Sequence, residues 1–142
     1  MKGWLLDTNV IAELARPICD PRVAAWADGV PEDTLFISVL TLAEYDKGIA
    51  TLALDAPQRA RYAAALSALE ARFAGRVLSV TDAVARRWGR ISGEVRRIVG
   101  QSPPVIDTLL AATAIEHDFC LVTRNVRDVR STGALVLDPW RA

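Results

Sequence analysis

The sequence has few of the residues that form zinc centres or dithiol redox sites. Its 142 residues include two cysteines, Cys19 and Cys120, and one histidine, His117, and the cysteines do not form a CxxC pair. Because such sites need clustered Cys and His ligands or paired thiols, both are excluded. We expect Cys120, in the apolar run 119–122, to be a small buried core residue. We expect His117 to be solvated or to cap the end of a helix.

The chain also lacks an excess of charge of either sign and a long apolar run. Lys and Arg together number 17, and so do Asp and Glu. Any contact with nucleic acid must therefore use a local basic patch. The first apolar run ends at Asp7, which is too short for the core of a signal peptide. No run approaches the roughly 20 residues that span a bilayer, so we expect a cytoplasmic protein without membrane contact.

The length and composition fit one folded domain, residues 1–142. Hydrophobic residues make up 51% of the chain and charged residues 24%, which is typical of a domain with a core. Short apolar runs at 3–6, 34–38, 76–80 and 119–123 alternate with helical patterns, and 134–137 is a candidate fifth strand. This alternation predicts an α/β fold with a mostly parallel sheet of four to five strands, covered by helices on both faces.

Prolines, glycines and capping residues mark the helix boundaries. Pro17 ends a short first helix, and Asp20 followed by Pro21 begins a second that runs to Gly29. Further helices are predicted after the second strand to about residue 51, over 57–75 and 81–100, and from 102–104 onward. Every strand but the last is thus followed by a helix, so the strands should end at one common edge of the sheet.

Three acids occupy positions where the local pattern calls for apolar or small residues. Asp7 follows the first strand directly, at the edge where open α/β sheets bind ligands. Asp107 begins a stripe with positions 110, 111, 114 and 115, so it should face the protein. Glu44 shares a stripe with Leu40 and Gly48 and should do the same.

Each acid taken singly could cap a helix or pair with an arginine. Together, carboxylates from three elements would repel one another unless one were protonated or a cation were bound. Mg²⁺ or Mn²⁺ suits such oxygen ligands. A cation of this kind activates water and neutralises a phosphate, so the three acids point to phosphoryl chemistry. Asn9, two residues after Asp7, stands where haloacid-dehalogenase-type phosphatases have a second aspartate, which disfavours that class.

The fourth predicted strand ends in a polar turn on the same edge. Asn125 and Asp128 add oxygen ligands there, and Thr123 can hydrogen-bond a carboxylate or a phosphate. The turn fits a further corner of the metal site, and it fits an Asx turn or helix cap equally well.

These residues, in this order, resemble the PIN-domain ribonucleases, specifically the VapC-type toxins of prokaryotic toxin–antitoxin pairs. The segments that carry the resemblance are LLDTNVI (5–11), SVLTLAE (38–44), IDTLLAATA (106–114) and VTRN with Asp128 (122–128). The FitB-like branch is suggested by ELARP (13–17) and DPW (138–140).

The resemblance implies a PIN-like three-layer α/β/α sandwich and a Mg²⁺-dependent endoribonuclease. Asp7, Glu44 and Asp107 match the three core acids, and Asp128 or Asn125 takes the fourth position, with Asn9 and Thr123 in support. It also implies a homodimer, and a small antitoxin that lies across the acidic pocket and carries the DNA-binding function. Two alternatives remain open: an RNA-processing PIN nuclease without an antitoxin, and a non-catalytic domain that binds RNA or protein.

The sequence offers one cluster of basic residues on a predicted helix. Its members are Arg86, Arg87, Arg90, Arg96 and Arg97. They either form a solvated face paired with Glu94 or, with Arg124, guide RNA toward the acids, since arginine forks suit phosphates. The four tryptophans have no regular spacing, so core and interface roles are expected for them.

Overall fold

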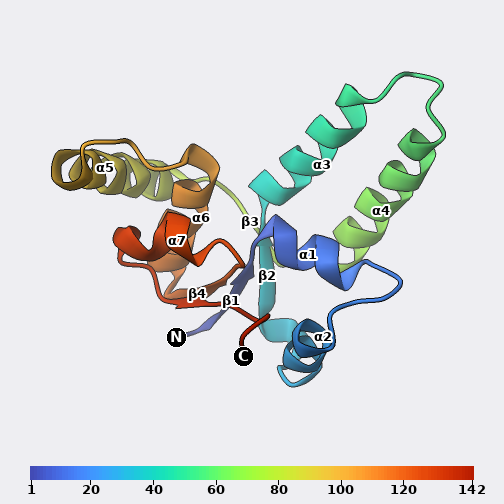
Figure 1. The fold of residues 1–142 in the computed structure, drawn as a ribbon, viewed down its shortest axis with the longest axis horizontal. Coiled ribbons are helices and arrows are strands. Elements are labelled where there is room, and N and C mark those ends of the chain that lie inside the picture. The colour runs from blue at the N-terminus through green and yellow to red at the C-terminus, as the bar shows by residue number, and fades with distance from the viewer.

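A five-stranded, all-parallel sheet forms the centre of the molecule. The computed structural model describes residues 1–142, and Figure 1 shows the strands between two groups of helices. The strands are β1 (Gly3–Leu6), β2 (Leu35–Ser38), β3 (Val77–Leu78), β4 (Phe119–Val122) and β5 (Val136–Leu137), in the order β3-β2-β1-β4-β5. All five predicted strands are present, although β3 and β5 are shorter than expected.

Helices cover both faces of this sheet, as predicted. On one side lie α1 (Thr8–Leu14), α2 (Pro21–Asp28), α3 (Val39–Thr51) and α4 (Gln58–Arg72). On the other lie α5 (Asp82–Val99), α6 (Val105–His117) and α7 (Val126–Val129). Short 3₁₀ turns occur at Glu32–Thr34 and Arg130–Thr132. The α/β/α prediction is therefore confirmed, and the polar turn predicted after β4 contains the short helix α7.

The helix boundaries follow the capping chemistry read from the sequence. An Asp20 carboxylate oxygen accepts a hydrogen bond from the Arg22 N–H at 2.9 Å, which caps α2. The Thr81 hydroxyl accepts one from the Val84 N–H at 3.2 Å, which caps α5. Gly100 ends α5 with φ of 91°, a left-handed conformation that favours glycine.

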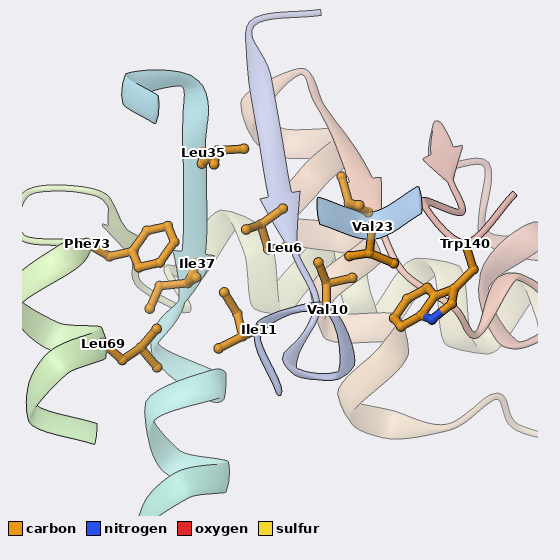
Figure 2. Close-up of a cluster of buried hydrophobic side chains, with 10 residues drawn as sticks. Leu6, Val10, Ile11, Val23, Leu35, Ile37, Leu69, Phe73 and Trp140 are labelled. Carbon is orange, nitrogen blue, oxygen red and sulfur yellow. The ribbon is translucent and has the colours of Figure 1, made fainter. Parts of the chain in front are cut away.

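Successive side chains of the strands point to opposite faces of the sheet, and each face packs against its own hydrophobic core. Leu6 faces a cluster with side chains from α1, α2 and α4, shown in Figure 2, whereas Leu5 packs with residues of α6. Cys120 is buried, as predicted. Trp140 lies in the first core, and Trp4 meets Trp26 edge to face with ring centroids 5.3 Å apart.

The strand order places a crevice at the carboxyl ends of β1 and β4. From β1 the chain adds β2 and then β3 on one side, and it returns through α5 and α6 to place β4 on the other side. Ligands of open α/β sheets bind at such a reversal. Leu6 pairs with Val122, so Asp7 and Thr123 emerge side by side. No helix is both long and apolar enough to cross a membrane.

Candidate active site

Asp7 is fixed at the bottom of this crevice by hydrogen bonds with β4, with the residue after β4 and with the first residue of α1. Its backbone N–H donates to the Val122 carbonyl at 2.9 Å, which extends the β1–β4 pairing by one residue. Its carboxylate accepts hydrogen bonds from the Thr8 N–H at 2.6 Å and from the Thr123 hydroxyl at 2.7 Å. The residue is only 6% exposed, so its orientation is set by the fold.

A polar network continues from Asp7 to the loop after β4. The Asn9 amide donates to Asp7 at 3.3 Å and to the Thr123 hydroxyl oxygen at 3.4 Å, and its own oxygen accepts from the Arg124 N–H at 3.3 Å. The Asn125 N–H donates to the Thr123 oxygen at 3.0 Å. The structure therefore joins the three expected supporting residues, although Asn125 contributes its backbone and its side chain is exposed.

Glu44 reaches the same network through a threonine. The Thr8 hydroxyl donates to a Glu44 carboxylate oxygen at 2.8 Å. Because that hydroxyl has one proton, it accepts from the Thr41 hydroxyl, 3.0 Å away. Thr8 is next to Asp7 in the chain, so these contacts place Glu44 at the rim of the crevice. The sequence reading missed Thr8 and Thr41, although both fall within the motifs it singled out.

The expectation that Glu44 faces the protein interior was wrong. Glu44 and Gly48 are both exposed. The reason is that α3 and α4 pack together and extend away from the sheet (Figure 1), so the side of α3 that carries Glu44 and Gly48 is left uncovered. Within the first turn of α3, Thr41 is fully buried.

Asp107 lies in the first turn of α6 and is half-buried, with the expected apolar stripe beneath it. The pKa of Asp107 is raised to about 6, first by burial and then by the negative charges of Asp7, Asp128 and Glu44, in that order. Acids from three other parts of the chain thus act electrostatically on Asp107. Burial also raises the pKa of Asp7, opposed by its hydrogen bonds from Thr123 and Thr8.

The donor chemistry of these acids fits a hard divalent cation. All offer carboxylate oxygens, which Mg²⁺ and Mn²⁺ prefer. No group of three or more His, Cys, Asp or Glu side chains is arranged to hold a metal ion by itself. Mg²⁺ keeps several waters and needs only one or two carboxylates from the protein. Asp107 would hold it together with Asp7, whose charge acts on Asp107 more strongly than those of Asp128 and Glu44.

One buried acid lies outside this cluster and shows what a structural carboxylate looks like. Glu13 is 6% exposed, but its oxygens accept hydrogen bonds from Arg16 at 3.1 Å and from the Asp20 N–H at 2.9 Å. Its charge is compensated locally, and it joins α1 to the start of α2. Asp107 has no such cationic partner.

Some of the arginines singled out in the sequence form ion pairs, and others do not. On α5, Arg97 pairs with Glu94 at 3.7 Å, as the solvated-face interpretation predicts, whereas Arg87 pairs with Glu116 of α6, which was not predicted. Arg86 and Arg90 are exposed and make no ion pair. The Arg124 guanidinium lies 4.9 Å from the centre of the Trp140 ring.

Comparison with known proteins supports one family. The PIN domain family model matches residues 4–133. The chain is 31% identical to Toxin FitB of Neisseria gonorrhoeae, over 96% of this chain and 97% of the relative. It is also 31% identical to VapC ribonuclease Y4jK of Sinorhizobium fredii, over 96% of each chain.

A solved structure of FitAB bound to an IR36 DNA fragment contains a chain with the same fold. Its TM-score is 0.83 at 31% identity, over 96% of this chain and 95% of that one. The family match covers most of the sequence, and the fold and the order of the acids agree with it. The chain therefore belongs to the PIN domain family.

Proposed function

We propose that this protein is a Mg²⁺-dependent endoribonuclease and the toxin of a toxin–antitoxin pair, with Mn²⁺ as a substitute cation. The observation that carries the proposal is the convergence of four carboxylates at the β1–β4 crevice, where burial and then the charges of the other three acids raise the pKa of Asp107 to about 6. A charge arrangement of this kind is unfavourable without a compensating cation. The naming of one relative as a VapC ribonuclease supports RNA as the substrate.

The carboxylates of Asp7, Glu44, Asp107 and Asp128 are the proposed ligands and catalytic groups. Mg²⁺ held by them would lower the pKa of a bound water and neutralise charge on the scissile phosphate. Asp7 is held in one orientation by the Thr8 N–H and the Thr123 hydroxyl. Thr8 also holds Glu44. Such hydrogen bonds from neighbouring residues keep reactive groups in place before substrate arrives.

The toxin role follows from the relatives. One is named Toxin FitB, and FitAB is the complex seen on DNA. We propose a small antitoxin that covers the acidic crevice and provides the DNA-binding part of the complex. An arginine from it could pair with Asp7, Glu44 or Asp107 in place of the metal. We further propose a homodimer, for which exposed apolar side chains such as Ile98 and Val99 are available.

Asp107→Asn should reduce the rate of RNA cleavage at least a hundredfold. The substitution keeps the size of the side chain and removes a charged ligand, and losses of about this scale follow removal of a group that stabilises the transition state. Cleavage of a labelled RNA in Mg²⁺ gives the rate, and circular dichroism checks the fold. The control is Asp46→Asn, which neutralises an exposed acid on a different helix, α3, and should leave the rate unchanged. Equal rates for Asp107→Asn and wild type would remove Asp107 from the site.

The same substitution should stabilise the metal-free protein at neutral and alkaline pH. The folded-state pKa of Asp107 is about 6, above the ordinary 3.8, so folding favours its protonated form. Stability therefore falls as pH rises from about 4 through about 6, as the carboxyl ionises. In EDTA, Asp107→Asn should melt at a higher temperature than wild type near pH 8, and the difference should shrink near pH 4. A difference that does not vary with pH would argue against carboxylate repulsion.

Expression of the chain alone should arrest bacterial growth, and co-expression of the product of the neighbouring upstream gene should relieve the arrest. Expression of Asp107→Asn is the control and should be harmless, because it lacks cleavage. If wild-type protein is harmless although it is folded and cleaves RNA in vitro, the RNA-processing nuclease without an antitoxin becomes the better description.

A further inference from the structure

A second charged feature lies beside the acids, and of its arginines the sequence had singled out only Arg124. A hollow of about 820 Å³ opens between the segment after β4 and the segment around β5. Its charged lining residues are Arg124, Arg127, Arg130, Arg141, Asp128 and Asp138. Four arginines against two aspartates make this a locally basic surface on a chain whose formal net charge is zero.

Most of these arginines are free to bind an external anion. Arg141 pairs with Asp138 at 3.8 Å, but its side chain is 88% exposed. Arg124, Arg127 and Arg130 are exposed and take part in none of the ion pairs of the molecule. The ring of Trp140 lies against Arg124 and is itself buried, so it positions the guanidinium and cannot stack on a base.

The hollow adjoins the acids through two of its lining residues. Asn125 and Asp128 belong to its lining, and the Asn125 N–H also bonds to Thr123, the residue that holds Asp7. Asp128 is one of the charges that raise the pKa of Asp107. A strand that places one phosphate at the acids therefore has its next phosphates within reach of α7 and the turn that follows it.

We propose that this arginine hollow binds the phosphodiester backbone of single-stranded RNA next to the bond that the acids cleave. The proposal rests on the ribonuclease function proposed above and locates its substrate track. Arginine guanidinium groups bind phosphate oxygens in a fork and do not depend on the base. The neighbouring α5 face is the weaker candidate, because its free arginines, Arg86 and Arg90, do not line the hollow that contains Asp128.

RNA is favoured over an acidic peptide by the position of the hollow. A peptide with acidic side chains would meet the carboxylate of Asp128 at the end of the hollow that adjoins the acids, and like charges there are unfavourable without a cation. A cleavable RNA strand has to enter that acidic end in any case, together with the cation that neutralises it.

The test measures binding of a labelled, mixed-sequence single-stranded RNA in EDTA, at several salt concentrations. Arg127→Gln/Arg130→Gln removes two free positive charges. It should weaken binding about tenfold or more at low salt and reduce the slope of log K against log salt by about 1.4, at about 0.7 per phosphate contact. Lys2→Gln/Arg61→Gln removes two exposed charges elsewhere and should change neither value. Circular dichroism confirms that each variant is folded.

The outcomes separate this proposal from the proposed function. Wild-type protein that neither binds nor cleaves RNA would overturn both. RNA cleavage by wild type with an unchanged salt slope in Arg127→Gln/Arg130→Gln would overturn the hollow alone. If the slope of log K against log salt is reduced in Arg86→Gln/Arg90→Gln instead, the RNA backbone binds along α5. If Arg127→Gln/Arg130→Gln binds RNA as wild type does but no longer binds the co-expressed product of the upstream gene, the occupant of the hollow is an acidic peptide.

Discussion

Mutual repulsion of carboxylates at one edge of a parallel sheet is the constraint on which this structure depends. Burial and the charges of Asp7, Asp128 and Glu44 hold Asp107 near a pKa of 6. The fold offsets part of this cost at Asp7, where the Thr123 hydroxyl and the Thr8 N–H donate to the carboxylate. Thr123 is in place because β4 pairs with β1 in register. The two buried cores stabilise that pairing, and so they hold together a site that would otherwise push itself apart.

The sequence predicted those parts of the fold that depend on local pattern. Strand–helix alternation predicted the layers, and Asp20 and Thr81 predicted helix starts. The position of Asp7 could be predicted because a polar residue directly after a buried strand lies at the carboxyl edge of a parallel sheet. Glu44 was misplaced because helical periodicity shows which residues share a face but not whether another element covers that face. Its true anchor, Thr8, depends on how α1 and α3 meet in space.

Burial of an acid helps to identify a functional site, but burial alone does not distinguish a functional acid from a structural one. Glu13 is as buried as Asp7, yet Arg16 and the Asp20 N–H compensate it. What distinguishes the crevice is that its acids have one another as neighbours and no cation. The arginine hollow escaped the sequence reading for a related reason. Arg127 and Arg141 come together only because β5 pairs with β4, whereas the arginines of α5 are visible as a run along one helix.

Calorimetric titration with Mn²⁺ tests the central claim most directly, since the four acids should bind a cation whether or not the RNA target is known. Wild-type protein and the Asp46→Asn control should bind Mn²⁺ with equal affinity, and Asp107→Asn should bind at least about tenfold more weakly, because one charged ligand is lost. Absence of binding by wild type, both alone and with RNA present, would contradict the account. So would equal affinity of wild type and Asp107→Asn.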